Sequence, residues 1–318
     1  MTKRKIVRTT GPTSKTAWME ERTTPPLPAH YGHVSSGSNN AEDAPMTAAK
    51  TTALKSGQYS KVEIDGRLMI VTINRPEVYN ALHHLAHEEL TAVFDEFQEN
   101  PDLWVAIVTG AGDKAFSAGN DLKYHAEYRA KHGKRPPASV KGFAGICSRF
   151  DLDKPLIAAV NGVAMGGGFE TALACDIIIA SEQAKFALPE PKVGLAAGAG
   201  GMQRLSRQIP LKKAMGMMLT ARHVPAKEGF ELGFVTAVVP HADLMKEAKR
   251  WAAMSLECSP MSIRATKQTV MRSLDVPATE IAMRNLSYPA FVAMTNSEDT
   301  VEGPKAFAEK RKPNWKGR

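Results

Sequence analysis

Two glycine-rich segments carry the side chains best suited to chemistry. In the first, an apolar run leads into three consecutive glycines, Gly166 to Gly168, which Phe169 and Glu170 follow. Glycine lets the chain approach a ligand closely, and a helix that starts near Gly168 offers free backbone N–H groups and a partial positive charge. Such a helix start can stabilise an oxyanion as it develops.

The second segment places another carboxylate twenty residues further along the chain. Glu190 lies between Pro189 and Pro191, and the two prolines restrict its backbone, which helps to fix where the carboxylate points. Together the two segments predict a functional site that contains two carboxylates and a group of backbone N–H donors.

Strand and helix patterns surround these segments. Residues 61–74 alternate apolar and polar side chains around Asp65-Gly66, a dipeptide favoured in two-residue turns, and so predict a β-hairpin. Apolar residues recur at helical spacing from Leu85 to Phe97, and almost throughout residues 198–307. Apolar runs predict further strands at residues 104–109, 156–160, 177–180 and 234–239. The sequence therefore predicts an α/β core followed by a helical region.

The composition is typical of a soluble globular protein. Of the 318 residues, 43% are apolar and 23% charged, which excludes general disorder and a fibrous repeat. No run of apolar residues is long enough to span a membrane. Cys147, Cys175 and Cys258 are far apart and odd in number. This pattern gives neither a disulfide framework nor metal-ligand spacing, and it indicates a reducing compartment.

The first 57 residues differ from the rest of the chain. They hold eight Lys and Arg against four Asp and Glu, so half of the net charge of +8 falls on them, and they contain five prolines. With almost no periodic apolar pattern, residues 1–57 are expected to be disordered or loosely attached. No apolar run of a secretory signal follows the basic start, and the acidic residues are atypical of an organellar transit peptide. An alternative is that translation starts at Met46.

From residue 59 onward the chain resembles the crotonase superfamily, the enoyl-CoA hydratases and isomerases. The resemblance covers residues 59–318 and rests on five motifs in the family's order and spacing. They are Arg75-Pro76 with Asn80-Ala81-Leu82, Ala115 to Leu122, Gly166 to Glu170, Phe186 to Glu190, and Gly198 to Gly201 leading to Gln203-Arg204-Leu205. The resemblance implies an α/β fold, the crotonase (ClpP-like) spiral of repeated ββα units at 58–255, and a C-terminal helical oligomerisation region at 256–318.

The resemblance also implies site residues. The backbone N–H groups of Asn120 and Gly167 correspond to the family's oxyanion hole for the acyl-CoA thioester. Glu170 and Glu190 correspond to the two glutamates of the hydratases. Isomerases of the family often keep only the second, and the hydroxycinnamoyl-CoA hydratase-lyases have a small polar residue in place of the first. The pair therefore favours hydration or dehydration.

The chemistry of water addition supports this assignment. A double bond conjugated to a thioester needs a base that activates water, an acid that protonates the α-carbon, and donors for the enolate oxygen. Each acid or base typically contributes about 10² to 10⁴ in rate, and each oxyanion donor about 10² to 10³. Two carboxyls and two N–H groups suffice, so no metal or redox cofactor is expected, and coenzyme A is part of the substrate.

Coenzyme A and a second copy of the chain are the expected partners. By resemblance, the CoA-binding residues are Glu77, Val78, Asp121, Leu122, Lys123, Phe307 and Lys310. The last two belong to the C-terminal helix and are expected to act from a neighbouring subunit. The family's usual assembly, trimers paired into hexamers, would also bury the largely apolar helices from Ala242 onward.

The sequence leaves alternatives open for the acyl group of the substrate and for the type of reaction. Residues 124–141, which cover the acyl pocket in this family, are basic and rich in His and Tyr, so a polar acyl group is one candidate. The segments 168–170 and 187–190 look most like the carnitinyl-CoA dehydratase branch, and a straight-chain enoyl-CoA fits equally well. An enoyl-CoA isomerase is the alternative reaction.

Four further expectations concern function and location. The basic N-terminal stretch would suit an RNA-binding crotonase-fold protein, although no RNA-binding motif supports this class. An inactive scaffold is disfavoured because both glutamates are present. The histidines at positions 83, 84, 125 and 132 lie in polar stretches and are expected to be exposed and without a catalytic role. A cytoplasmic location without membrane contact is expected.

Overall fold

The computed structural model describes residues 56–318. The predicted N-terminal extension, including the alternative start at Met46, therefore lies almost wholly outside the described residues. The helical and strand elements of residues 56–318 follow the α/β order that the sequence predicts.

A β-hairpin opens the described part, as the alternation of residues 61–74 predicts. β1 (Ser60–Asp65) pairs antiparallel with β2 (Leu68–Ile73), and Asp65 lies opposite Leu68. The two-residue loop is therefore Gly66-Arg67, and Gly66 adopts a φ of +59°, which glycine reaches without a steric penalty. α1 (His84–Glu99) follows and buries one face, with Leu90, Phe94 and Phe97 among its buried residues.

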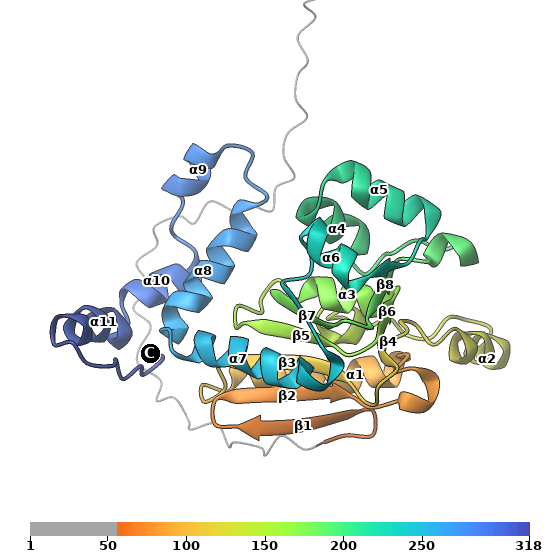
Figure 1. Cartoon of the computed structure of the whole chain (residues 1–318), viewed down its shortest axis with the longest axis horizontal. Coiled ribbons are helices and arrows are strands. Elements are labelled where there is room, and N and C mark those ends of the chain that lie inside the picture. Colours follow the sequence, from red (N-terminus) through yellow and green to blue (C-terminus); the bar gives the residue numbers. More distant parts are fainter. Residues whose placement is uncertain (1–55) are drawn as a thin grey trace, which may run out of the picture. The chain divides into compact units, whose positions relative to one another are not determined.

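The larger sheet has the strand order β1-β2-β3-β5-β7-β10, which can be followed in Figure 1. Its later strands are β3 (Val105–Gly110), β5 (Leu156–Val160), β7 (Ile177–Ser181) and β10 (Ala237–Val239). Every pair after the hairpin is parallel. β3 and β5 are buried throughout, as expected of parallel strands that are covered on both faces. The strand predicted at 234–239 is confirmed only from Ala237 onward.

A second, smaller sheet alternates with the first along the chain. Its strands, in spatial order, are β4 (Ala115–Ser117), β6 (Val163–Met165), β8 (Lys185–Ala187) and β9 (Val224–Pro225). A helical segment follows each of the first three: α2 (Leu122–His132), α3 (Gly167–Ala174), and η3 (Glu190–Val193) with α4 (Gly201–Gln208). The chain thus repeats a ββα unit that gives one strand to each sheet, and the predicted spiral is confirmed.

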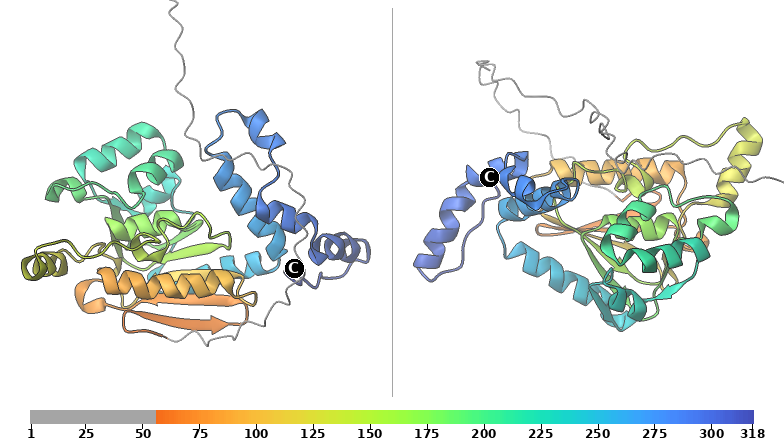
Figure 2. Two further views of the ribbon diagram at one scale, coloured as in Figure 1. Left: turned by 180° about the vertical axis from the view of Figure 1, so that it is seen from behind. Right: turned by 90° about the horizontal axis from the view of Figure 1, so that it is seen from above.

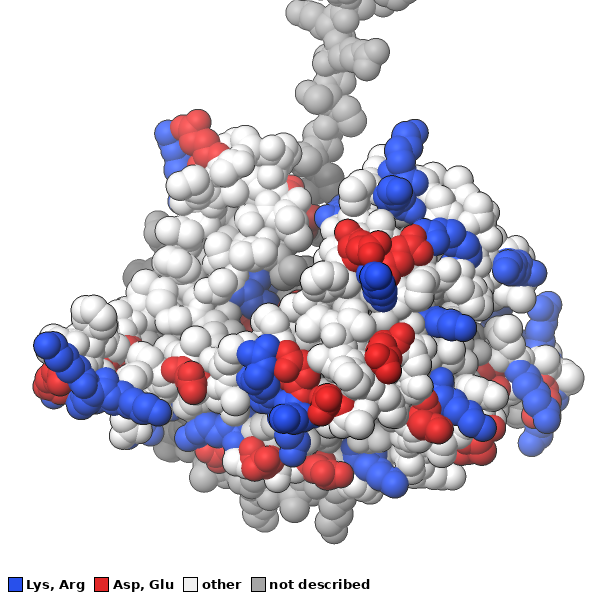
Figure 3. All heavy atoms as spheres, viewed as in Figure 1, with Lys and Arg blue, Asp and Glu red and all other residues white. Residues whose placement is uncertain are grey.

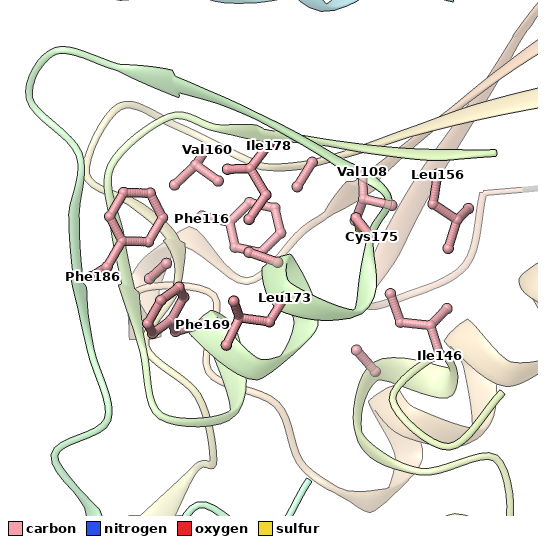
Figure 4. Packing of buried hydrophobic residues seen from close by; sticks show 14 of the residues in the cluster. Val108, Phe116, Ile146, Leu156, Val160, Phe169, Leu173, Cys175, Ile178 and Phe186 are labelled. Carbon is pink, nitrogen blue, oxygen red and sulfur yellow. The ribbon is translucent and has the colours of Figure 1, made fainter. Parts of the chain in front are cut away.

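The main core lies between the sheets and is anchored by aromatic rings. Figure 4 shows Phe169 and Leu173 of α3 pointing into this cluster, where Phe116 and Phe186 also lie. The ring centroids of Phe169, Phe186 and Phe234 are 5.1–5.2 Å from one another. Because Phe169 directly precedes Glu170, this packing fixes the start of α3.

Helices cover the other face of the larger sheet. α7 (Leu244–Leu256) buries Leu244, Ala248 and Ala252, which recur every four residues along one face of the helix. They pack in a second apolar cluster with residues of β3, β5 and β7, and Trp315 from the end of the chain joins them. The remaining helical segments of the spiral are η1 (Pro76–Val78), η2 (Phe143–Gly145), α5 (Leu211–Thr220), α6 (Ala226–Leu232) and η4 (His241–Asp243).

The last part of the chain is helical, as predicted. It consists of α8 (Pro260–Ser273), α9 (Thr279–Arg284), α10 (Pro289–Thr295) and α11 (Glu298–Ala308). The buried carboxylate of Asp299 accepts hydrogen bonds from Ser259 Oγ at 2.8 Å and from the N–H groups of Lys316 at 2.7 Å and Gly317 at 3.3 Å. One side chain therefore joins α11, the start of α8 and the segment after α11.

Figure 2 shows, in agreement with Figure 1, that α11 lies on the opposite side of the spiral from α2. The proposed boundaries at 57/58 and 255/256, and an oligomerising role for residues 256–318, stay predictions. Within residues 56–318, no helix has both the length and the apolar character that crossing a bilayer demands.

Candidate active site

Three neighbouring strands bring the predicted site residues to one edge of the smaller sheet. β4, β6 and β8 run parallel and side by side, and Asn120, Gly167 and Glu190 each follow the end of one of them. Because parallel strands end at the same edge, segments far apart in sequence meet there. The first turn of α3 adds Glu170 to this group.

Two backbone N–H groups at this edge have no acceptor in the described part of the chain. Within residues 56–318, neither Asn120 N nor Gly167 N donates a hydrogen bond. The chain preceding Asn120 passes tightly over the start of α3, since a Cβ added to Gly119 would lie 2.5 Å from the carbonyl oxygen of Met165 and 3.0 Å from Gly167 N. Gly119 also has a φ of +89°, so both its space and its backbone angle require glycine.

Polar side chains hold the segment that carries Asn120. Ser117 Oγ donates to the carbonyl oxygen of Asn80 at 2.8 Å and accepts from Gly119 N at 3.1 Å. The buried amide of Asn80 donates to the carbonyl oxygens of Ala111 and Ala115 at 3.0 and 2.8 Å. These contacts give the Asn80-Ala81-Leu82 motif a physical role, because they fix the position of the first donor.

Glu170 is a buried carboxyl group on α3. Its side chain is only 3% exposed, and Oε1 accepts a hydrogen bond from Gly201 N, at the start of α4, at 2.8 Å. Burial, together with the nearby charge of Glu190, raises the pKa of Glu170 to about 7. A carboxyl with this pKa can both give and take a proton near neutral pH.

Glu190 opens η3 and approaches the same helix start. Its Oε1 lies 3.0 Å from where a Cβ on Gly166 would be, so it borders the glycine turn before α3. Its Oε2 is buried and has no hydrogen-bond partner in the part of the chain that the structure describes. Burial raises the pKa of Glu190 above its ordinary value. A carboxylate oxygen without an internal partner suits proton exchange with a bound molecule.

The predicted CoA-binding residues fall into two groups. Glu77 and Val78 form η1, and the carboxylate of Asp121 lies 3.0 Å from the guanidinium of Arg75, directly before η1. Asp121 also caps α2 by accepting from Tyr124 N at 3.0 Å. The neighbouring side chains of Leu122 and Lys123 are exposed. This first group thus borders the segment of Asn120.

The second group lies elsewhere in the described chain. Phe307, near the end of α11, is 87% exposed, and Lys310 is exposed after it. α11, which carries Phe307 and ends shortly before Lys310, is on the opposite side from α2, as Figure 2 shows. A single chain therefore does not bring Phe307 and Lys310 to its own glutamate pair.

The expectation that His83 is exposed is wrong. His83 is 5% exposed, its Nδ1 accepts from Ala86 N at 3.2 Å, and its ring packs on Tyr124 with centroids 4.7 Å apart. The polar sequence around it is the first turn of α1, which α2 covers. His84 and His125 are half-buried, and only His132 is exposed as expected.

His87 and Phe143 are two neighbours of the site that sequence reasoning missed. His87 is buried on α1, and its ring centroid lies 4.4 Å from that of Phe143. The Phe143 ring in turn fills the place of a side chain at Gly167, 2.5 Å from the Cβ position. The sequence does contain a signal for His87: it lies at helical spacing from Leu90 and Phe94, which puts the histidine on the buried face of the helix.

Nowhere in residues 56–318 do three or more His, Cys, Asp or Glu side chains come together to form a metal site.

Residues 63–318 match the profile of a family described as Enoyl-CoA hydratase/isomerase. The chain belongs to this family.

Enoyl-CoA hydratase/isomerase relatives agree with the profile. The chain is 42% identical over 256 residues to the carnitinyl-CoA dehydratase of Escherichia coli, which covers 80% of this chain and 97% of that protein. Among solved structures, the enoyl-CoA hydratase from Mycobacterium tuberculosis is 35% identical, with a TM-score of 0.76 over 82% of this chain and all of that one. The enoyl-CoA hydratase from Bacillus anthracis is 33% identical, with a TM-score of 0.73. The chain is an enzyme of the hydratase and dehydratase type, a lyase.

Proposed function

We propose that this enzyme is an acyl-CoA hydro-lyase that adds water to, or removes it from, the double bond of a 2-enoyl-CoA thioester. The observation that carries the proposal is the buried carboxyl of Glu170 and the half-buried Glu190, which has one buried oxygen without a partner in the described chain. Both lie beside the unpaired N–H groups of Asn120 and Gly167. Family membership and the dehydratase relative support the reaction class.

In the proposed hydration, each of the four groups has one task. The N–H groups of Asn120 and Gly167 hold the thioester oxygen and stabilise the enolate that forms. Ionised Glu170 takes a proton from water, whose oxygen bonds to the β-carbon. Protonated Glu190 gives its proton to the α-carbon, and the enolate returns to the thioester. Dehydration reverses these steps, with Glu190 as base and Glu170 as acid.

The substrate is a coenzyme A thioester, and no further cofactor takes part in the proposal. The Escherichia coli relative is named for carnitinyl-CoA, so the branch with that substrate is one candidate, and a straight-chain enoyl-CoA is another. We place the enzyme in the cytoplasm, a reducing compartment, because Cys147, Cys175 and Cys258 are all unpaired.

A neighbouring copy is proposed to complete the CoA site with Phe307 and Lys310. Figure 3 shows few charged side chains over α8 and α10. Large apolar side chains are exposed along α8 to α11: Val270, Met271, Leu274, Ile281, Met283, Leu286, Val292, Val301 and Phe307. Exposed apolar side chains in this number, on neighbouring helices with few charges, favour an interface. The proposed assembly is a homotrimer or homohexamer, which sedimentation at several concentrations distinguishes from a monomer.

Oxygen incorporation from labelled water tests the proposed reaction. We expect the full chain to convert a 2-enoyl-CoA to a product that carries one solvent oxygen. Glu170→Gln and Glu190→Gln should each lower turnover by at least about 10², because each keeps the side chain's shape and removes a proton-transfer group. Near-native hydration by either folded variant would contradict the two-carboxylate mechanism.

The isomerase alternative gives a different result in the same assay. Isomerisation moves a proton between the α- and γ-carbons, which one carboxylate can do. Conversion of a 3-enoyl-CoA without incorporation of labelled oxygen from water would therefore favour the isomerase. For the hydratase, Glu170→Ala should abolish oxygen incorporation and leave slow exchange of the α-proton through Glu190.

A further inference from the structure

His87 is a buried histidine that the proposed reaction does not use. It lies on α1, it is 8% exposed, and its ring packs against Phe143. A buried polar side chain normally has all its hydrogen-bonding atoms satisfied. The partners of its two ring nitrogens therefore indicate what it does.

Only one of the two ring nitrogens has a partner. Nδ1 accepts a hydrogen bond from Ala144 N at 3.2 Å, so the neutral ring carries its proton on Nε2. Burial, with the neighbouring His83, His125 and His84, lowers the pKa of His87 to about 4, which keeps the ring neutral near pH 7. No acceptor for the Nε2–H is found in residues 56–318. Nε2 is also absent from the fully buried side-chain atoms that lack a partner in residues 56–318, so this donor borders accessible space and is free to meet a ligand.

This donor lies next to both segments that carry the oxyanion donors. On one side, the ring contacts Phe143, whose own ring covers Gly167. On the other side, α1 contacts α2, the helix that begins directly after Asn120 and Asp121, since Tyr124 Oη lies 2.9 Å from Nδ1 of His84. A thioester oxygen held by both donors brings its acyl group beside these same segments, and this region is the acyl space of the inference that follows. The Phe143 ring separates His87 from Gly167, so His87 is a candidate contact of the acyl group and not of the thioester oxygen.

The charge of the surrounding segment limits the acyl group further. Residues 122–141 carry one acidic side chain, Glu127, against six basic ones: Lys123, Arg129, Lys131, Lys134, Arg135 and Lys141. A positive potential over the acyl space disfavours a cationic acyl group and favours a neutral or an anionic one. The free donor adds a preference for an oxygen acceptor.

We propose that His87 Nε2–H donates a hydrogen bond to an oxygen atom of the acyl group, and that the enzyme thereby selects acyl-CoA thioesters with a hydroxyl, carbonyl or carboxylate oxygen beyond the β-carbon. This inference rests on the proposed function, since it assumes that an acyl-CoA occupies the site. It makes His87 a specificity-determining residue that takes no part in proton transfer.

Binding of saturated thioesters tests the inference without any reaction. Calorimetry compares hexanoyl-CoA with 6-hydroxyhexanoyl-CoA, adipoyl-CoA and the cationic γ-butyrobetainyl-CoA. We expect the wild type to bind at least one of the two oxygenated thioesters about tenfold more tightly than hexanoyl-CoA, a gain typical of one buried hydrogen bond. His87→Leu should abolish this preference and change the Kd of hexanoyl-CoA by less than about threefold. His87→Gln, which keeps an N–H donor, should retain part of it.

His132→Leu is the matched control, because His132 is exposed and should leave all four Kd values unchanged. Equal binding of hexanoyl-CoA and both oxygenated thioesters by the wild type would overturn the inference. So would tightest binding of γ-butyrobetainyl-CoA, or an equal loss of affinity for all four thioesters in His87→Leu, which would indicate a packing role through Ala144 and Phe143.

The failure of this inference differs from the failure of the proposed function. Oxygen incorporation into crotonyl-CoA by the wild type tests the hydro-lyase proposal by itself, because this substrate has no additional oxygen for His87 to bind. A wild type that incorporates oxygen but shows no binding preference overturns only the role of His87. A wild type with the preference but no oxygen incorporation overturns only the hydro-lyase proposal, and loss of all acyl-CoA binding overturns both.

Discussion

Glu170 and Glu190 lie beside one helix start but in different surroundings. Glu170 accepts a hydrogen bond from Gly201 N, whereas Glu190 keeps one buried oxygen without a partner in the described chain. Their roles in the proposed reaction are opposite in the two directions, since Glu170 must be ionised for hydration and protonated for dehydration. The pH dependence of each direction therefore depends on the same carboxyl.

Because the pKa of Glu170 is raised to about 7, the two directions should show opposite pH profiles. We expect hydration to fall as pH drops below about 7, where Glu170 becomes protonated, and dehydration to fall as pH rises above it. Initial rates in each direction between pH 5.5 and 8.5 check this. Parallel profiles in both directions would show that Glu170 is not the group that titrates.

Gly119 is the residue whose replacement should most directly move a donor. In Gly119→Ala, the added Cβ would meet the carbonyl oxygen of Met165 at 2.5 Å, at a φ of +89°, so the segment of Asn120 must shift. We expect turnover to fall by about 10². Gly66→Ala is the control, since its φ of +59° is similar but its surroundings are open. It should cost about 1 kcal/mol of stability and leave the rate of the folded enzyme unchanged.

At the scale of elements, α1 and α2 meet through histidine and tyrosine side chains. No residue of α2 is fully buried, and Tyr124 Oη lies 2.9 Å from Nδ1 of His84 on α1. Burial lowers the pKa of His83, and that of His87 to about 4. Both rings are therefore neutral in the folded protein at pH values where an unfolded histidine is protonated.

The free energy of unfolding should fall as pH drops from 6.5 to 4. The unfolded chain binds protons at His87 in this range and the folded chain does not, so protonation favours unfolding. At about 1.4 kcal/mol for each pH unit, His87 alone contributes on the order of 3 kcal/mol. Urea unfolding at several pH values should show a smaller decrease for His87→Gln than for His132→Gln. Equal pH dependence in these two variants would contradict a neutral, buried His87.

These two helices also show what the sequence could predict. Apolar periodicity predicts the strands and the helix at 85–97. Sequence motifs predict the four site residues, because the glycines in these motifs stand where a side chain would clash with a neighbouring segment. These site residues are Asn120, Gly167, Glu170 and Glu190. The burial of His83 depends on α2 covering the start of α1, and that of His87 on its contact with η2, segments about 40 and 57 residues apart. Local polarity gives no sign of the first contact. Similarly, the sequence does not predict how far α11 lies from the two glutamates, because that distance depends on how the helices and sheets pack in three dimensions.

At the scale of the whole molecule, Asp299 joins the C-terminal helices to the segment that follows them. Its buried carboxylate accepts from Ser259 and from two backbone N–H groups, and that segment carries Trp315 onto the second apolar cluster. Loss of the acceptor would leave three donors unsatisfied.

Asp299→Ala should therefore lower the free energy of unfolding by about 2 to 3 kcal/mol. It should also open the segment after α11 to trypsin at Arg311 and Lys316. Asp299→Asn, which keeps one carbonyl oxygen acceptor, should lose less. Thermal unfolding and limited proteolysis measure both effects, and an unchanged Tm with no new cleavage would show that Trp315 holds this segment unaided.

Main-chain donors have a consequence for mutational scans of this molecule. The N–H of Asn120 survives replacement of its side chain, and the side chain makes no hydrogen bond within residues 56–318. Asn120→Ala should thus keep activity within a few-fold, while the neighbouring Gly119→Ala fails. A tolerance map would label position 120 dispensable and position 119 essential, although the proposed oxyanion donor is at 120. Replacing the amide that contains this N–H by an ester, through semisynthesis, would expose the contribution that side-chain scanning misses.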